Sequence, residues 1–248
     1  MILGIDIGNT TVEFGIIEEG RVTSYKFSSD RYKTVDDWLV NIDFISRKGI
    51  NPESILISSV VPQIEEKIEL SLLKFFGIKP VIIGKDLQVP IKINYENPQE
   101  VGIDRLLNAY AGVKLSKPPL VVIDLGTAIT FDIVNENGEY EGGMIFPGME
   151  SSIDTLFSKT AKLPKVKLEK PESFIGKNTV NSIQSGIYYG YTSLIDRMVE
   201  KINIYHGRDF DVIITGGHGR MISSGLYSQH KLIENLSMLG IWFLAKQL

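Results

Sequence analysis

Short apolar runs alternate with turn residues at the start of the chain. Ile2–Ile5 is an apolar run that leads into the polar segment Asp6–Thr11. Two further β-rich runs, Val12–Ile17 and Arg21–Phe27, flank the turn Glu18-Glu19-Gly20. This pattern predicts three strands joined by tight turns.

Further along the chain, apolar positions recur every three or four residues, which predicts helices. The expected helices are Val35–Lys48, Gln63–Phe76, Gly102–Leu115, Met149–Lys159 and Ser182–Asn203. Strands or extended segments are expected at Ile55–Val60, Val81–Ile83, Val89–Tyr95, Leu120–Ile123, Thr130–Val134 and Asp211–Ile214. Gly142-Gly143 predicts a turn. Strands that alternate with helices predict an α/β fold.

The opening pattern recurs in the second half of the chain. With one offset of 118 and no gap, the matching pairs are Ile5 and Ile123, Asp6 and Asp124, Gly8 and Gly126, and Gly20 and Gly138. This repeat predicts an internal duplication, although hydrophobic-Asp-hydrophobic-Gly is also a common sequence pattern where a strand leads into a turn. Lys117-Pro118-Pro119 is the best candidate boundary. We therefore expect an N-terminal half at 1–117 and a C-terminal half at 118–248.

Composition narrows the classes of function. The 248 residues carry a net charge of −4, which argues against a nucleic-acid partner that binds through bulk electrostatics. The chain has no cysteine, so disulfides, thiolate catalysis and Cys-ligated zinc are excluded. No apolar run is long enough for a membrane span, and the first residues are not typical of a signal peptide. We therefore expect a cytoplasmic protein without a membrane partner.

The segment Asp6–Thr11 has the chemistry of a phosphate-binding turn. A strand ends in a carboxylate, a glycine lets the backbone approach a ligand, and Asn9, Thr10 and Thr11 offer short polar groups. Backbone N–H groups and hydroxyls suit phosphate oxygens, and the carboxylate suits Mg²⁺. The run Asp124–Thr127 repeats the arrangement, so we expect two turns that clamp a polyphosphate from both sides.

Two other short motifs have both a functional and an ordinary interpretation. In Thr215-Gly216-Gly217, bare backbone after a strand can carry a flat base and ribose, or it can be a simple strand-to-helix turn. Asp104 can take the proton of an attacking alcohol, or it can be a first-turn Asp that the helix dipole favours. Arg105 can pair a carboxylate or phosphate, or it can be a surface charge. Neither a Walker-type loop nor G-x-G-x-x-G is present.

The two repeated turns and the Thr-Gly-Gly motif resemble those of the acetate and sugar kinase, Hsc70 and actin superfamily. An ordered set of motifs over nearly the whole chain is similar to type III pantothenate kinases. The set is Asp6-Ile7-Gly8-Asn9-Thr10, Pro98-x-x-x-Gly102-x-Asp104-Arg105, Asp124-Leu125-Gly126-Thr127-Ala128, Gly142-Gly143 with Pro147-Gly148, Thr160-Ala161-Lys162-Leu163-Pro164, and Gly176-Lys177-Asn178-Thr179.

The resemblance implies a fold and an activity. The fold would be two duplicated ribonuclease H-like halves, each a mixed sheet flanked by helices, with ATP in the cleft between them. The activity would be transfer of the ATP γ-phosphate to pantothenate, giving 4′-phosphopantothenate in the first step of coenzyme A biosynthesis. The implied cofactors are Mg²⁺ and a monovalent cation, K⁺ or NH₄⁺. A homodimer is implied as well, in which the second protomer helps to form the substrate pocket.

The resemblance also assigns roles to individual residues. Asp104 would be the general base. The implied substrate contacts are Tyr95, Gly102, Ile103, Asp104, Arg105 and Thr179. The implied nucleotide contacts are Asp6, Ile7, Gly8, Asn9, Thr10, Thr11, Val12, Glu13, Thr127, Gly216 and Gly217. Asp6 would hold Mg²⁺ and Asp124 the monovalent cation.

Two alternatives remain open on the sequence. One is another small-molecule kinase of the same superfamily, such as a sugar kinase, which would want a more polar pocket than the surroundings of Tyr95 indicate. The other is an ATP-dependent regulatory module that keeps both phosphate turns but lacks an acceptor base. The pair Asp104-Arg105 argues against the second alternative.

Overall fold

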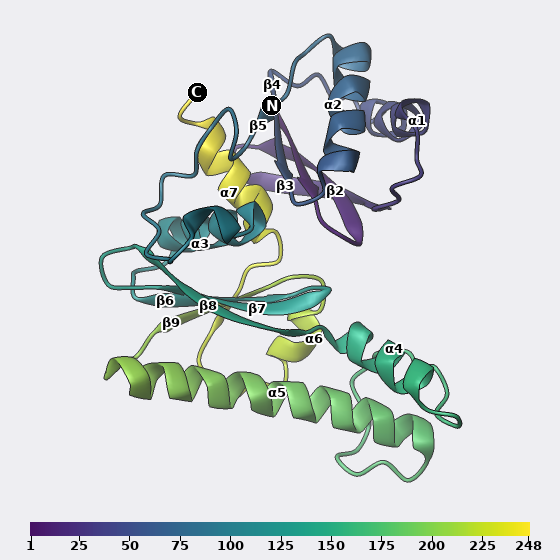
Figure 1. Cartoon of the computed structure of the whole chain (residues 1–248), viewed down its shortest axis with the longest axis vertical. Coiled ribbons are helices and arrows are strands. Elements are labelled where there is room, and N and C mark those ends of the chain that lie inside the picture. Colours follow the sequence, from purple (N-terminus) through teal and green to yellow (C-terminus); the bar gives the residue numbers. More distant parts are fainter. The chain divides into compact units, whose positions relative to one another are not determined.

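A computed structural model describes residues 1–248, and their internal contacts divide the chain into two compact units (Figure 1). Unit 1 comprises Met1–Ile91, Glu96–Ala111 and Asn235–Leu248. Unit 2 comprises Lys92–Tyr95 and Gly112–Glu234. The domain boundary after residue 117 and the ATP cleft between the halves stay predictions.

Unit 1 is built on a five-stranded mixed sheet with the order β3-β2-β1-β4-β5. Its strands are β1 (Ile2–Ile7), β2 (Thr11–Glu18), β3 (Arg21–Ser28), β4 (Ser54–Ser59) and β5 (Val81–Ile82). Its helical segments are α1 (Val35–Ser46), α2 (Pro62–Phe76), the 3₁₀ turn η1 (Pro98–Glu100), the first part of α3 (Ile103–Leu115), and α7 (Leu236–Ala245).

Local sequence explains where the helices of unit 1 begin and end. Thr34 caps α1 and forms a reciprocal capping box with Asp37. Pro62 occupies the first turn of α2, where its missing N–H costs nothing, and Gly77 ends that helix with a φ of +68°. The buried faces of both helices pack on the sheet in a core that includes Trp38 and Ile68.

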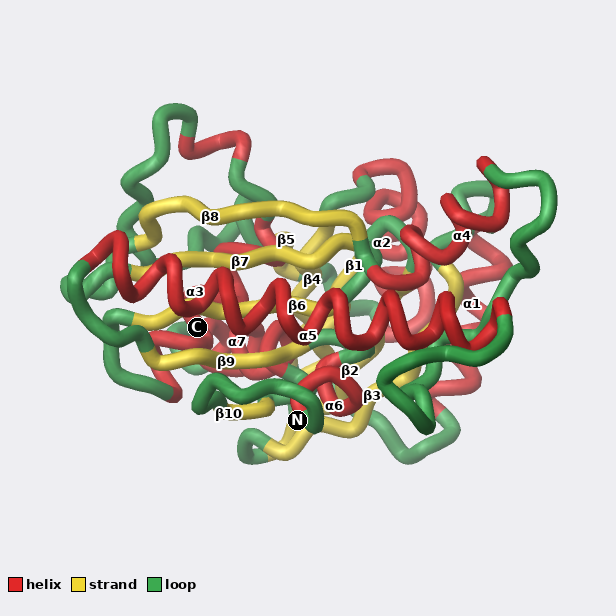
Figure 2. Tube along the Cα trace, turned by 90° about the horizontal axis from the view of Figure 1, so that it is seen from below, coloured by secondary structure: helices red, strands yellow, loops and turns green.

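Unit 2 repeats the architecture with a second five-stranded mixed sheet, of order β10-β9-β6-β7-β8. Its strands are β6 (Leu120–Leu125), β7 (Ala128–Val134), β8 (Tyr140–Pro147), β9 (Asp211–Thr215) and β10 (Lys231–Leu232). Its helices are α4 (Met149–Lys159), α5 (Thr179–His206) and α6 (Gly219–Ser223). Figure 2 shows α5 lying across one face of this sheet, where it buries apolar residues such as Ile195 against β6 and β7.

The strand pairings confirm the duplication. In unit 1, β1 runs antiparallel to β2 and parallel to β4, and in unit 2, β6 runs antiparallel to β7 and parallel to β9. The gap-free register was wrong, however. Asp6 lies opposite Glu13, whereas Asp124 lies opposite Thr130, so the offset falls from 118 to 117 in the second strand. The cause is the turn, which has three residues after β1 and two after β6.

Gly142-Gly143 and the C-terminal helix differ from the expectation. Gly142-Gly143 is not a turn but lies inside the edge strand β8. The helix α7, which packs on β1 and β4 of unit 1, was not expected from the sequence. Val89–Tyr95, which was expected to be extended, forms no regular strand and contributes an isolated bridge between Ile93 and Tyr140. None of the helices combines the length and the hydrophobicity that crossing a membrane requires.

Candidate functional site

Three polar side chains form a row across adjacent strands of unit 1. Asp6 on β1 lies directly opposite Glu13 on β2 and Ser58 on β4. Residues at directly opposite positions share one face of a sheet, so the three side chains point the same way. Asp6 and Glu13 were expected from the sequence, whereas Ser58 was not, because nothing in its own segment marks it.

The carboxyl group of Asp6 is the centre of this row. Burial raises the pKa of Asp6 to about 7, and the nearby carboxylates of Asp104 and Glu13 add to the rise. The hydroxyls of Ser58 and Ser237 offset part of it. A bound cation stabilises the charged form of a carboxylate that other carboxylates crowd, so the row is a candidate cation site.

Asp104 lies in the first turn of α3, as expected, and its carboxylate folds back toward the backbone at the N-terminus of the helix. Asp104 Oδ1 accepts a hydrogen bond from the backbone N–H of Arg105 at 2.8 Å. A Cβ atom at Gly102 would collide with this carboxylate, so the preceding glycine keeps its place clear. Burial raises the pKa of Asp104, and Arg105 moderates the rise. The result is a partly buried carboxylate of increased basicity close to Asp6.

The turn after β1 is fixed by its own backbone and by one serine. The N–H of Gly8 donates to Thr11 O at 2.9 Å, and Ser29 Oγ donates to Gly8 O at 2.7 Å. Asn9 and Thr10 at its tip are exposed, so their polar groups can meet a ligand. Ser29 was not expected from the sequence, because it comes after β3, two strands further along the chain.

The other predicted contacts in unit 1 are less accessible. Ile7 and Val12 are buried in the core, so only their backbone can meet a nucleotide. Thr11 begins β2 and is half-buried. Ile103 begins α3, also half-buried, and its side chain approaches Gly84.

Unit 2 carries the matching row of oxygen-bearing side chains. Asp124 on β6 lies opposite Thr130 on β7 and Thr215 on β9. A Cβ atom at Gly216 would come within 2.6 Å of Leu125 N and would overlap the Asp124 carboxylate. Glycine is therefore required at 216, which has a φ of +88°. Gly217 is exposed, with open space where a side chain would be.

The turn after β6 is held against the start of α4. The carbonyl of Thr127 accepts hydrogen bonds from Gly148 N and Ser151 Oγ, both at 3.1 Å. Gly148 caps α4, and a Cβ there would overlap this turn. The Pro147-Gly148 motif thus has a structural purpose, since it brings the positive end of a helix dipole to the turn, a favourable setting for phosphate.

Two predicted substrate contacts lie far apart within unit 2. The ring of Tyr95 lies against Gly142, next to Glu141, whose carboxylate is 3.8 Å from His206 at the C-terminal end of α5. Thr179 is the first residue of the same helix. A helix of 28 residues is about 40 Å long. Tyr95 and Thr179 of one chain therefore cannot touch the same small molecule.

The surroundings of Asp6 fit a divalent cation that is shared with a ligand. Glu13 Oε2 pairs with Lys26 at 3.1 Å, while Glu13 Oε1 is buried without a hydrogen-bond partner. No three or more Asp, Glu, His or Cys side chains are arranged to hold a metal ion by themselves. The buried, unpartnered oxygen of Glu13 opposite Asp6 fits Mg²⁺, which is bound through one or two carboxylates and completes its shell with phosphates and water.

Comparison with known proteins decides the family. A model of the family described as type III pantothenate kinase matches residues 2–201. A type III pantothenate kinase from Sulfurihydrogenibium sp. (strain YO3AOP1) is 54% identical over 99% of this chain and 100% of its own length. One from Persephonella marina (strain DSM 14350 / EX-H1) is 58% identical over 98% and 97%. The chain belongs to the type III pantothenate kinase family.

Solved structures agree on the fold of this pantothenate kinase family member. A Campylobacter jejuni protein that carries the name of a Baf family transcriptional activator superposes with a TM-score of 0.62 at 19% identity, covering 99% of this chain and 98% of that one. An acetate kinase from Entamoeba histolytica gives 0.50 at 9% identity, with 100% and 99% covered. At such identities the likeness shows the fold alone, which is a duplicated α/β fold with two five-stranded mixed sheets.

Proposed function

We propose that the chain phosphorylates pantothenate. The γ-phosphate of ATP moves to the substrate hydroxyl, giving ADP and 4′-phosphopantothenate, the first step of coenzyme A biosynthesis. The observation that carries this conclusion is the 54–58% identity, over nearly the whole chain, to relatives named for this activity. As the resemblance implies, we place the reaction in the cytoplasm.

Asp104 is the general base of this proposal. The substrate oxygen forms a bond to the γ-phosphorus, the bond from that phosphorus to the bridging oxygen of ADP breaks, and the hydroxyl proton passes to Asp104. Its raised pKa makes the carboxylate a stronger base than an exposed Asp. Arg105 beside it offers a guanidinium for the pantothenate carboxylate or for phosphate oxygens. Phosphoryl transfer otherwise needs mainly positioning and charge stabilisation.

The two rows of oxygen ligands are assigned to the cations. When bound, Mg²⁺ neutralises the charge that develops on the phosphates. Asp6 would hold it, with Glu13 nearby, and the tips of the two turns, at Asn9 and Thr127, would contact the phosphates. Asp124 would provide the carboxylate of the K⁺ or NH₄⁺ site, where Thr130 and Thr215 on the same face supply only oxygen.

A homodimer in which each protomer completes the other's pocket accounts for the separation of Tyr95 and Thr179. Thr179 lines a cavity of about 580 Å³ between α4 and the start of α5. Large apolar side chains close to it in sequence are exposed, including Phe174 at 70% and Ile175 at 71%. Such exposure is typical of a surface that another protein covers. We propose that Thr179 acts in the pocket of the second protomer.

Asp104→Asn tests the base assignment. The variant keeps the shape of the side chain but cannot accept the proton, so we expect kcat for phosphopantothenate formation to fall by about 10²- to 10⁴-fold. Binding of ATP, measured by calorimetry, should stay within about twofold of the wild type, because no base is needed for it. A near-wild-type kcat would eliminate Asp104 as the base.

Mixing two variants, each of which we expect to be inactive by itself, tests the shared pocket. A heterodimer of Asp104→Asn and Thr179→Ala chains has one pocket with both changes and one with neither. A 1:1 mixture with random assortment should therefore recover about a quarter of wild-type activity, since half of the dimers are mixed and half of their pockets are intact. If Thr179 served its own chain, no pocket would be intact and mixing would restore nothing.

A further inference from the structure

The segment Lys92–Tyr95 lies along the beginning of β8 in unit 2. Asn94 N donates to Tyr140 O, and Tyr140 N donates to Lys92 O, both at 2.8 Å. The segment thus adds one parallel bridge to the open edge of the sheet. A single bridge is weak by itself, because so short a pairing buries little surface.

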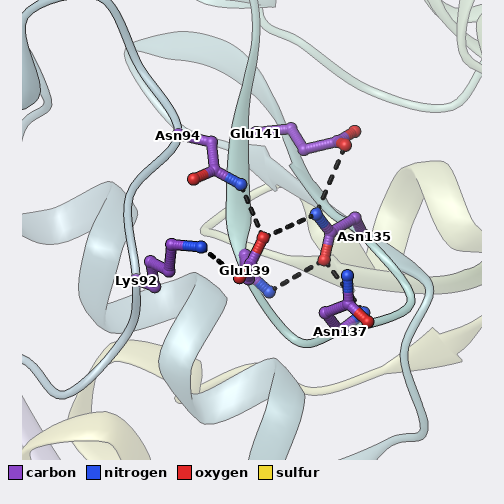
Figure 3. A network of polar contacts seen from close by, with 6 residues as sticks. All are labelled: Lys92, Asn94, Asn135, Asn137, Glu139 and Glu141. Atoms are coloured by element: carbon purple, nitrogen blue, oxygen red, sulfur yellow. Dashed lines mark hydrogen bonds and ion pairs between the residues drawn. The ribbon is translucent and has the colours of Figure 1, made fainter.

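Side chains reinforce this bridge through one carboxylate (Figure 3). Lys92 Nζ donates to Glu139 Oε1, and Asn94 Nδ2 donates to Glu139 Oε2, both at 2.7 Å. Asn135 Nδ2 donates to Glu139 Oε2 at 3.2 Å and reaches Glu141 Oε1 at 3.4 Å. Both oxygens of Glu139 are therefore used, and each binds a different residue of the segment.

Asn135 in turn fixes the β7–β8 turn on which Glu139 stands. Its Oδ1 accepts the backbone N–H of Glu139 at 3.1 Å, and its own N–H donates to Glu139 O at 3.0 Å. The carboxylate is thus presented from a turn that is closed on itself. Donors that hold Glu139, first Lys92 and then Asn94 and Asn135, lower its pKa to about 2. Glu139 consequently stays ionised at any pH at which the enzyme can be assayed.

The next residue after the anchored Asn94 is Tyr95, which has one covered and one open side. A Cβ atom at Gly142 would come within 3.1 Å of the Tyr95 ring, so the ring lies on the bare backbone of β8. The ring of Tyr140 lies beside it at a centroid distance of 6.5 Å. Tyr95 nevertheless remains 38% exposed. Its position depends on where the segment is fixed to β8.

We propose that Glu139 is a positioning residue for pantothenate, which acts by fastening Lys92 and Asn94 so that Tyr95 presents its open face to the substrate. This proposal rests on the proposed function, in which Tyr95 contacts pantothenate. It differs from a merely structural role because Glu139 serves one substrate and not the other. Misplacing a contact by about 1 Å can cost up to about 100-fold in rate, so the effect should be measurable.

The test compares two charge-neutralising variants in the same turn. Glu139→Gln loses the acceptor that binds two residues of the segment. Glu136→Gln is the matched control, because Glu136 is exposed and faces Arg208 Nη1 at 3.6 Å. We expect Glu139→Gln to raise the KM for pantothenate roughly tenfold at all pH values from 6 to 9, with the KM for ATP within twofold. Glu136→Gln should leave both KM values unchanged.

Two further measurements keep the proposal falsifiable if Glu139→Gln folds poorly. Asn94→Ala leaves Glu139 and the turn intact, and we expect a several-fold rise in the same KM. In a Tyr95→Ala background, Glu139→Gln should add no further rise, because its effect passes through Tyr95. Amide hydrogen exchange should accelerate at Asn94 in Glu139→Gln and stay unchanged along α5.

The outcomes distinguish failure of the proposed function from failure of the positioning role of Glu139. If the wild type shows no pantothenate-stimulated turnover, the proposed function itself fails, and this inference fails with it. If the wild type is active but Glu139→Gln has an unchanged pantothenate KM, only the positioning role is overturned. An equal rise in both KM values, or additivity with Tyr95→Ala, would also overturn it, because each would indicate general damage or a separate effect.

Discussion

Replacing Asp6 by Asn should stabilise the ligand-free protein at alkaline pH and should abolish the phosphorylation for which we propose that Asp6 holds Mg²⁺. Burial and neighbouring carboxylates raise the pKa of Asp6 from 3.8 to about 7. Between these values the folded chain keeps a proton that the unfolded chain has lost, so stability falls as pH rises through this window. At about 1.4 kcal/mol per pKa unit the upper limit is about 4 kcal/mol. Because Asp6 is only half-buried by solvent accessibility, solvent screening reduces our expectation to about 1–2 kcal/mol.

The assay is urea unfolding followed by tryptophan fluorescence. Both tryptophans, Trp38 and Trp242, belong to unit 1, so the signal reports the unit that contains Asp6. We expect equal free energies of unfolding for wild type and Asp6→Asn at pH 4, and an advantage of about 1–2 kcal/mol for the variant at pH 8. Saturating Mg-ATP should stabilise only the wild type.

A control with the opposite sign is available in the same unit. Hydrogen bonds from the backbone and hydroxyl of Thr34 lower the pKa of Asp37. Its contribution is therefore present at neutral pH and is lost as pH falls, so Asp37→Asn should destabilise at pH 8 more than at pH 4. An Asp6→Asn difference that did not change with pH, or a wild type that was the more stable at pH 8, would refute the reasoning for Asp6.

Two further predictions concern unit 2. Gly216→Ala should lower the free energy of unfolding by about 2–3 kcal/mol in urea titrations, because the methyl group would approach Leu125 N at 2.6 Å at a position with φ of +88°. Gly217→Ala is the control, which should change stability little but raise the KM for ATP. Equal destabilisation by both variants would contradict the packing argument. Turnover in K⁺ should exceed turnover in tetramethylammonium by roughly tenfold or more, because a second cation offsets the crowded negative charge of the carboxylates and phosphates. Asp124→Asn should abolish that difference. Identical rates in the two buffers would contradict the role assigned to Asp124.

The local signals in the sequence were sufficient for most elements and for the two turns. The strand-turn patterns at Asp6 and Asp124 depend on a few consecutive residues, and the structure confirms a duplicated sheet around them. Helix periodicity placed α1, α2 and α4 within two residues of their observed ends. Gly142-Gly143 was expected to form a turn, but both residues lie in a strand, where Gly142 leaves room for the Tyr95 ring.

What the sequence could not show depends on pairing between distant segments. Ser58 and Thr130 become members of the two rows only through strand register, which no local pattern specifies. The distance between Tyr95 and Thr179 follows from the way α5 runs along the sheet. Glu139 carries no motif, and only its contacts with Lys92 and Asn94 reveal it as a candidate for positioning the substrate.

The most direct test of the function is ADP release with Mg-ATP and K⁺, measured with pantothenate, common sugars or acetate as the acceptor. We predict that pantothenate alone stimulates release, with 4′-phosphopantothenate formed in equal amount. Stimulation by a sugar or acetate instead would contradict the assigned acceptor. ATP binding without release for any acceptor would contradict the assignment of an enzyme and favour a regulatory module.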